Sequence, residues 1–508
     1  MSRISRTSLM LAVFLLADKG LGIVRQLIIA RQFGFSQSLD AFNVANNIPD
    51  LLFALISGGA LAMAFIPVLT EVLTKNGRSE SWALFSRIAN LAFVITGVLA
   101  VVVALLADPL VRSAVAPGFA EAQKQTVVTL MRFNLIATLI FSVSGLVMAG
   151  LQANKHFFFP ALAPLLYNVG QIFGATILAP TEGYIVLGIH LPAFGLGVYG
   201  LVYGVILGAA LHLAIQIPGL VRFQFHWVPQ FGLVNAQVRK VLNIMGPRLV
   251  TMLFVQLTFI VRDYLASQLP TGSVSALTYG WMVMQVPETV IGTVIGIVLL
   301  PTLSELVAKE DWVELKATIE RAVRVLVALT IPLAVLLMLG LRPLLVLAFK
   351  LDPAQTDLLL WSCRGFLVGL TGQCILEIVI RSFYARQDAV PPLITAGINF
   401  GIYIGLGSLL YRPLGAPGIA LTDALAFTSQ ALLLLFLLNR RLSSRINIGG
   451  SLPRGLAAGV AAGIVAVVII ILSGDKLAGL LGSLAGMALG AAAAVPIVWR
   501  ELCVLARL

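Results

Sequence analysis

The sequence predicts an all-α integral membrane protein, and three observations lead to that fold class. First, 59% of the 508 residues are hydrophobic and 11% are charged, whereas soluble domains carry about 25% charged residues. Second, apolar stretches of about 20 residues, which suffice to cross a bilayer as helices, recur from end to end. Third, no segment between these stretches is long enough for a folded domain outside the membrane.

About fourteen transmembrane helices are predicted. Several are longer than one straight crossing requires, so tilted, kinked or extended helices are expected. The predicted spans are residues 8–31, 40–73, 83–108, 124–152, 160–180, 192–218, 236–268, 273–307, 318–340, 355–383, 389–411, 417–439, 454–473 and 477–499.

The N-terminus begins with basic residues and an apolar run, as a signal peptide does, but lacks a small-x-small cleavage site. Because the apolar run continues past Lys19 to Ala30, an uncleaved first span is the better interpretation. Segments on the N-terminal side of the membrane carry about three times as many Lys and Arg as the opposite segments. This bias predicts that both termini are cytoplasmic. It also attributes the net charge of +12 to topology and anionic lipids, so no nucleic acid partner is expected.

Two pairs of segments indicate an internal repeat. FIPVLTEVLTK (65–75) matches LLPTLSELVAK (299–309), and QANKHFFFPALAPLLYN (152–168) matches YARQDAVPPLITAGIN (384–399) at nearly the same offset. Six predicted spans separate the copies, so both halves share one orientation and form a parallel repeat of two six-helix lobes. The expected divisions are residues 1–225 and 226–445 for the two lobes and 446–508 for two additional helices.

Two cations in the first span point to an anionic ligand. Lys19 and Arg25 lie about midway through it, where a charge costs about 2.5–3.5 kcal/mol and usually faces a wet cavity or a bundle interior. They are about 9 Å apart along a helix and about 120° apart around it. Gly20 and Gly22 between them permit a bend that would let both reach one ligand. Alternatively, Arg25 extends outward to the interface and Lys19 pairs with Asp18 or another acid.

Polar residues of other spans extend this candidate substrate site. Asp40 opens the second span, either as a cavity-facing acid or as a helix N-cap, and Asn47 is expected to face the same cavity. Glu288 lies near the middle of the eighth span without an adjacent cation, and is the expected protonatable or cation-pairing group. Arg262 adjoins Asp263 near the outer end of the seventh span, where a local ion pair is the alternative to substrate contact.

The sequence lacks the motifs of several other protein classes. It has no G-x-x-x-x-G-K-[ST] phosphate loop, and its four histidines form no H-x-x-x-H pair. The three cysteines lack metal-ligand spacing. Because no nucleophile motif or soluble catalytic domain is visible, neither enzyme activity nor a cofactor is expected.

Several segments resemble a known family: KGLGIVRQLIIARQFGFSQSLDAFNVANNIPDLL, GGALAMAFIPVLTE, VAPGFAE, PALAPLLYN and FYARQDAVPPLITAGIN. They are similar to the lipid II flippases (MurJ/MviN) of the multidrug/oligosaccharidyl-lipid/polysaccharide exporter superfamily, over nearly the whole chain. The resemblance implies a V-shaped pair of lobes and alternating access in the bacterial cytoplasmic membrane. The implied substrate is undecaprenyl-pyrophosphate-linked disaccharide-pentapeptide. Arg25 would bind its pyrophosphate in fork geometry and Lys19 as a point charge.

The chain lacks positively charged residues at two positions where the family pattern places them in the cavity. The family carries an arginine where this chain has Phe53, and an Asp-Arg pair where it has Trp281 and Met282. The resemblance also implies a sodium site in some family members. Asn399 fits one of its positions, Tyr403 stands where a carboxylate is expected one turn later, and Asp423 is the candidate substitute.

Three functional hypotheses remain open at this point. The first is a lipid II flippase, and the second is an exporter of another polyprenyl-linked glycan or amphiphile, which the missing cations favour. The third is a membrane scaffold for cell-wall synthesis enzymes that transports nothing. The first two predict that Arg25→Ala abolishes function while expression persists. The expected partners are a lipid-linked oligosaccharide, membrane lipids and possible cell-wall synthesis enzymes.

Overall fold

The computed structural model is almost entirely helical. It describes residues 3–56, 59–186, 188–232, 235–442, 446–447, 449–473 and 477–505. Within these residues the only sheet is an antiparallel pair of two-residue strands, β1 (Ile185–Val186) and β2 (Ile189–His190). The predicted all-α membrane fold class is therefore confirmed.

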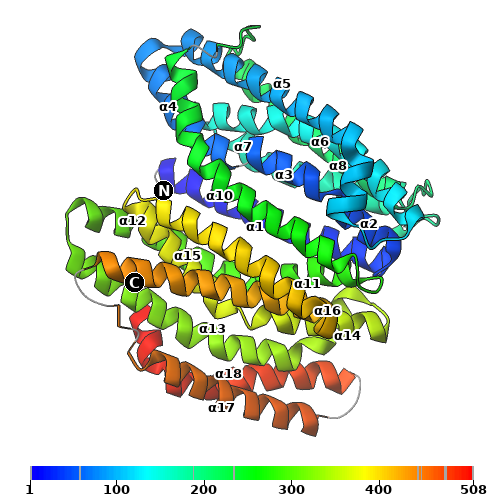
Figure 1. The fold of residues 1–508 in the computed structure, drawn as a ribbon, viewed down its shortest axis with the longest axis vertical. Helices are drawn as coiled ribbons and strands as arrows, with labels where there is room; N and C mark the ends of the chain where they lie inside the picture. Colours follow the sequence, from blue (N-terminus) through cyan, green and yellow to red (C-terminus); the bar gives the residue numbers. More distant parts are fainter. Residues whose placement is uncertain are drawn as a thin grey trace. The chain divides into compact units, whose positions relative to one another are not determined.

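The chain divides into two compact units, Met1–Thr271 and Gly272–Leu508, called unit 1 and unit 2 below. Helices α1 to α10 belong to unit 1 (Figure 1). Their bounds are α1 (Arg3–Phe33), α2 (Gln37–Ala45), α3 (Asn47–Ile56), α4 (Gly59–Asn76), α5 (Arg78–Leu110), α6 (Glu121–Ala153), α7 (Phe158–Phe173), α8 (Val198–Ala214), α9 (Ile217–Arg222) and α10 (Ala236–Ala266), with π-helical turns η1 (Val111–Val115) and η2 (Gly174–Leu178).

Unit 2 contains helices α11 to α18, and its last two helices, α17 and α18, pack against each other and against α13 (Figure 1). The bounds are α11 (Ser273–Glu288), η3 (Thr289–Thr293), α12 (Val294–Ala308), α13 (Trp312–Phe349), α14 (Pro353–Leu367), α15 (Leu370–Ala385), α16 (Val390–Arg441), α17 (Ser451–Leu472) and α18 (Leu477–Leu505). The three-part division at residues 225 and 445 stays a prediction.

Among the described residues, ten helices are long and apolar enough to cross a membrane, or eleven if the bent pair α14 and α15 is one span. The count of fourteen is not confirmed by this measure and stays a prediction. Part of the difference has a clear cause. The 52-residue helix α16 covers two predicted spans, and its backbone leaves the helical conformation at Gly415 (φ 63°, ψ −146°). The second predicted span, 40–73, falls on three helices, α2, α3 and α4.

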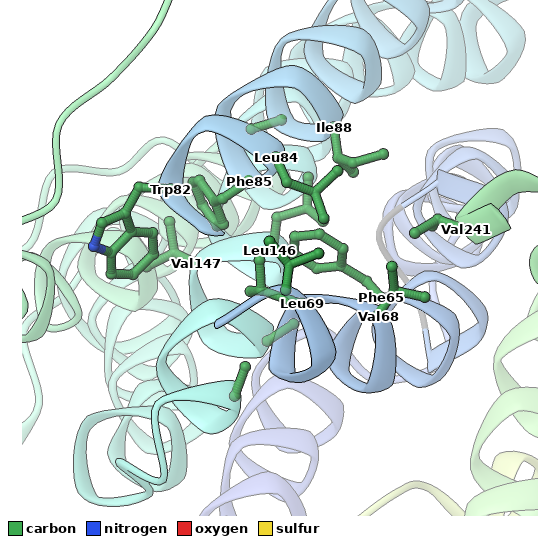
Figure 2. Close-up of a cluster of buried hydrophobic side chains, with 14 of the residues drawn as sticks. Phe65, Val68, Leu69, Trp82, Leu84, Phe85, Ile88, Leu146, Val147 and Val241 are labelled. Atoms are coloured by element: carbon green, nitrogen blue, oxygen red, sulfur yellow. The ribbon is translucent and has the colours of Figure 1, made fainter. Parts of the chain in front are cut away.

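A cluster of buried aliphatic and aromatic side chains joins α4, α5, α6 and α10 in unit 1 (Figure 2). Trp82 packs edge-on against Phe85, with ring centroids 5.5 Å apart. The Trp82 indole Nε1 donates a hydrogen bond to the Phe223 carbonyl at 3.0 Å, so its polar atom is satisfied. Between membrane helices, such side chains stabilise the fold mainly through close van der Waals packing, because lipid tails are as apolar as the side chains themselves. This cluster fixes the end of α4 that carries the first repeat segment.

The first pair of repeat segments has the same local structure in both units. Glu71 and Lys75 form an i,i+4 ion pair at 2.9 Å at the end of α4. Glu305 and Lys309 form the corresponding pair at 2.6 Å at the end of α12. Each of these exposed ion pairs stabilises its helix by only about 0.2–0.5 kcal/mol. They matter here because they agree with the predicted repeat.

Helices α7 and α8 approach each other closely through glycines. A Cβ atom on Gly170 would lie 2.4 Å from the Gly208 Cα, and one on Gly174 would lie 2.6 Å from the Gly204 Cα. Glycines spaced four residues apart on both helices remove the side chains that would hold the backbones apart, as is common in membrane helix pairs.

A valine at Gly204 should therefore lower the melting temperature of the purified protein. Its Cβ would meet the Gly174 Cα at 2.8 Å, and overpacking of this kind costs about 1–3 kcal/mol. Gly405→Val is the matched control, because a Cβ on Gly405 in α16 meets nothing within 4 Å. Equal melting temperatures for the two variants, measured by fluorescence in detergent, would contradict the close packing of α7 and α8.

Candidate functional site

The guanidinium of Arg25 in α1 is held by an amide of α7. Arg25 Nη1 donates a hydrogen bond to Asn168 Oδ1 at 2.9 Å. The same Asn168 amide donates through Nδ2 to Asp18 Oδ1 at 2.8 Å. Arg25 is half-buried, and its Nε is buried with no hydrogen-bond partner among the described residues. Asn168 thus positions the Arg25 guanidinium through Nη1, and the Nε–H group of Arg25 is left without a protein partner among the described residues.

Lys19 lies on the same helix but is exposed and stands apart from this arrangement. Within the described part of the chain, Lys19 forms no ion pair with Asp18, whose carboxylate accepts instead from Asn168. The helix runs from Arg3 to Phe33 without interruption. The structure therefore brings Arg25, and not Lys19, into a hydrogen-bonded site.

A cavity of about 410 Å³ lies inside unit 1 beside this arrangement. Its walls come from the start of α3, from α6, from α7 and from α8. Its polar lining residues are Asn46, Asp50, Asn134, Thr138, Tyr167 and His212. Arg25 interacts electrostatically with both Asp50 and Tyr167, so the cation lies near this cavity.

Asn134 and His212 are fixed by hydrogen bonds to their neighbours. Asn134 Nδ2 donates to Asn46 Oδ1 at 2.8 Å. His212 Nδ1 lies 2.6 Å from the Ser144 hydroxyl, and Gln216 Nε2 donates to that hydroxyl at 2.9 Å. These hydrogen bonds hold the polar groups of this wall of the cavity in place.

Arg262 and Asn47 share one acidic partner in unit 1. Arg262 Nε donates to Asp263 Oδ1 at 2.8 Å, and Asn47 Nδ2 donates to Asp263 Oδ2 at 3.0 Å. The Arg262 guanidinium also lies 5.1 Å from the Phe259 ring centroid. The ion-pair alternative for Arg262 and Asp263 is present, and it ties α10 to the start of α3.

Asp40 is buried, with 1% of its surface exposed. It lies in the first turn of α2, where a carboxylate favours the positive end of the helix dipole. The N-cap of α2 is Ser36, whose hydroxyl accepts from the Leu39 amide at 3.3 Å. The N-cap interpretation of Asp40 is therefore wrong, because Ser36 is the N-cap of α2, but the place of Asp40 in the first turn agrees with a helix-dipole role.

Glu288 lies at the end of α11, where the chain passes into the π-helical turn η3. It is 9% exposed, and its carboxylate accepts from the Thr293 hydroxyl at 3.0 Å. Glu377 and Arg381 of α15 act on it electrostatically and form an ion pair with each other. Glu288 thus lies near the Glu377–Arg381 ion pair in unit 2. Inserted π-helical turns often accompany functional sites.

The two sodium candidates both lie on α16, one on each side of Gly415. Asp423 is 2% exposed and accepts from Gln373 Nε2 at 3.3 Å. Asn399 is 5% exposed, and its Oδ1 has no hydrogen-bond partner in the described part of the chain. Within the described residues, no group of three or more His, Cys, Asp or Glu side chains could hold a metal ion.

Sequence reasoning did not select Asn168, Asp50, Asn134 or His212 as site residues. A signal existed only for Asn168, which the repeat aligns with Asn399 at the end of both matched segments. Asp50 follows a proline in the second predicted span, but its position in the sequence does not show which residues of other helices lie near it. Only the packing of α3, α6 and α8 shows that Asp50, Asn134 and His212 line one cavity.

The sequence matches a family model described as lipid II flippase MurJ over residues 29–489. The chain belongs to the lipid II flippase MurJ family. A protein of Burkholderia cenocepacia named lipid II flippase MurJ is 32% identical, over 86% of this chain and 84% of that protein. A protein of Vibrio cholerae named probable lipid II flippase MurJ is 25% identical, over 85% and 82% of the two chains.

Solved structures agree on the fold. A lipid II flippase MurJ in an inward closed conformation has a TM-score of 0.82 at 20% identity, covering 97% of this chain and 100% of that chain. An inward-facing multidrug resistance MATE family transporter of the MOP superfamily has a TM-score of 0.68 at 14% identity, covering 85% and 97%. The chain therefore shares its fold with these two proteins.

Proposed function

We propose that this protein is a flippase that moves lipid II from the inner to the outer leaflet by alternating access. The family to which the chain belongs supports this substrate. The observation that carries the proposal is the hydrogen bond from Arg25 to Asn168, because it positions a guanidinium partway along an apolar helix. A pyrophosphate cannot cross hydrocarbon without such a partner, and Arg can bind it through two parallel hydrogen bonds.

Native mass spectrometry of the purified protein tests this proposal. We expect selective retention of lipid II over undecaprenyl phosphate and bulk anionic phospholipid in the wild type, and loss of that selectivity in Arg25→Ala. A charge-assisted hydrogen bond contributes about 1.5–3 kcal/mol, so affinity should fall by a factor on the order of tenfold to a hundredfold.

Arg132→Ala is the control for the loss of one arginine. Arg132 is exposed in α6 and donates only to the Ala104 carbonyl, at 2.9 Å, in the described part of the chain. Its variant should bind lipid II as the wild type does. Equal binding of all three lipids, insensitive to Arg25, would favour another polyprenyl-linked cargo or a non-transporting scaffold.

The other predicted site residues of unit 1 support Arg25 in this proposal. Lys19 adds an exposed positive charge six residues from Arg25 and guides the anionic headgroup toward it. Asp40, Asn47 and Arg262 are further polar residues of unit 1 that could contact the headgroup, and Arg262 is available to it only when its pair with Asp263 opens.

Glu288 is proposed as the group that exchanges a proton or a cation during transport. Its burial, its threonine partner and its proximity to Glu377 support this role. A sodium site at Asn399 and Asp423 is the weaker alternative, supported by the free acceptor on Asn399. No covalent chemistry and no cofactor enter this mechanism, so the protein acts as a transporter and not as an enzyme.

The protein spans the membrane many times, and we place it in the bacterial cytoplasmic membrane with both termini in the cytoplasm. The excess of Lys and Arg on the N-terminal side supports this orientation. Its ligands are then the lipid-linked oligosaccharide and the surrounding lipids, and cell-wall synthesis enzymes are the proposed protein partners. In this proposal residues 1–225 and 226–445 act as the two lobes, and residues 446–508 are additional helices.

A further inference from the structure

The charges around the unit 1 cavity do not favour a pyrophosphate. Two acids, Asp18 and Asp50, and one base, Arg25, lie on or beside it. Asp18 is bound to Arg25 through the Asn168 amide, and Asp50 interacts electrostatically with Arg25. These three side chains carry no net positive charge, whereas a pyrophosphate carries more than one negative charge. Additional positive charge is required to hold it in a membrane.

The cavity contains oxygen acceptors that lack donors. The Asp50 side chain is exposed toward the cavity that it lines, and within the described residues no side chain donates a hydrogen bond to its carboxylate. Asn134 is 2% exposed, and its Oδ1 has no hydrogen-bond partner in the same part of the chain. The Thr138 hydroxyl, which also lines the cavity, does not donate to either acceptor, because it donates to the backbone carbonyls of Asn134 and Pro49.

The buried Asn134 Oδ1 without a donor costs about 1–3 kcal/mol, and a bound cation or water in the cavity would remove that cost. The Asp50 carboxylate lines the same cavity. Carboxylate and amide oxygens are the ligands of hard divalent cations. Mg²⁺ in particular keeps several waters and is commonly held by one or two carboxylates together with substrate phosphates. A cavity of about 410 Å³ has room for such a hydrated ion.

We propose that Asp50 and Asn134 bind a divalent cation, of the class of Mg²⁺, that bridges unit 1 to the pyrophosphate of the lipid substrate. The inference rests on the proposed function, since the pyrophosphate completes the site. Arg25 binds one side of the pyrophosphate and the cation neutralises the other. The cation then supplies charge on the cavity wall where Phe53 lies, the position at which the family resemblance implies an arginine.

Lipid II binding to the full-length protein in detergent, measured by native mass spectrometry at constant ionic strength, tests this inference. Micromolar to millimolar MgCl₂ is compared with EDTA and with NaCl. We expect Mg²⁺ to strengthen binding in the wild type by a factor on the order of tenfold, equivalent to about 1.4 kcal/mol. Asp50→Asn keeps the shape of the side chain and should bind lipid II equally with Mg²⁺ and with EDTA.

Two further variants make the result specific to the cavity. Asp108→Asn is the matched control, because Asp108 is an exposed carboxylate of the same unit that pairs with Arg112 at 2.8 Å, and it should keep the Mg²⁺ dependence. Phe53→Arg places a guanidinium one turn from Asp50 and should make binding independent of Mg²⁺. Its melting temperature is measured first, because Phe53 packs against Phe141 with ring centroids 5.2 Å apart.

The possible outcomes separate this inference from the proposed function. Wild-type binding of lipid II that is the same in Mg²⁺ and EDTA would overturn the cation site but leave the flippase proposal standing. Mg²⁺ dependence that persists in Asp50→Asn would place the ion on the free pyrophosphate, and would also overturn the site. Failure to bind lipid II under every condition would overturn the proposed function and this inference with it.

Discussion

Replacing Arg262 with methionine should destabilise unit 1 by about 3–5 kcal/mol, the usual cost of removing one partner of a buried ion pair. The side chains of Arg262 and Asp263 are 8% and 1% exposed. Without the guanidinium, the Asp263 carboxylate would keep only the Asn47 amide among its partners in the described residues. A single neutral donor does not offset the desolvation of a carboxylate. The melting temperature of the purified variant measures this loss.

The double variant Arg262→Met/Asp263→Leu decides whether Arg262 is structural or binds substrate. Replacing both charges with apolar side chains is often neutral for stability, so the double variant should melt near the wild type. If Arg262 serves only the ion pair, this variant should also bind lipid II normally. A stable double variant that has lost lipid II binding would instead assign Arg262 to the substrate. A single variant as stable as the wild type would contradict the ion pair itself.

Features that depend on local sequence were predictable. The all-helical membrane fold follows from apolar runs and few charges, because a backbone in hydrocarbon must satisfy its hydrogen bonds within each segment. The importance of Arg25 follows from the cost of a charge at that depth. The pairing of Arg262 with Asp263 could be proposed because the two residues are adjacent in the sequence.

Features that depend on contacts between distant segments were not predictable. Asn168 is 143 residues from Arg25 and 150 from Asp18, and no periodicity connects them. Asp50 and Asn134 line one cavity only because α3 packs against α6. The Asn47 contact with Asp263 likewise bridges 216 residues. A single sequence indicates how deep each polar residue lies in the membrane, but it does not show which other helix that residue contacts.

Span boundaries were predictable only where helices follow apolar runs. Hydropathy separates residues 389–411 from 417–439 at a short segment that contains Pro413, and the backbone of α16 leaves the helical conformation in that segment, at Gly415. Conversely, the apolar run at 40–73 breaks into α2, α3 and α4. Hydrophobicity reports where a segment can lie, whereas local backbone geometry decides where a helix ends.

Asn168→Leu should abolish transport about as completely as Arg25→Ala, although it leaves every charge in place. Asp18 and Arg25 are seven residues apart in α1 and so lie on the same face of that helix. The Asn168 amide now lies between them, accepting from Arg25 and donating to Asp18. With leucine in its place, the guanidinium and the carboxylate should pair directly, and Arg25 would be neutralised before the pyrophosphate arrives. Complementation of cells depleted of their own lipid II flippase measures the loss, with protein level monitored by immunoblot.

A second substitution separates this positioning role from a packing role. In the Asn168→Leu background, Asp18→Asn removes the competing carboxylate and should restore a large part of complementation, because Arg25 is again available. Asn154→Leu is the matched control for loss of one asparagine amide, because Asn154 Nδ2 donates to the Gly150 carbonyl of its own helix at 2.9 Å, away from Arg25 in the sequence and outside the proposed site. It should leave complementation unchanged. If Asp18→Asn restores nothing while the protein level is normal, Asn168 would be needed for the packing of α1 against α7 rather than for the positioning of Arg25.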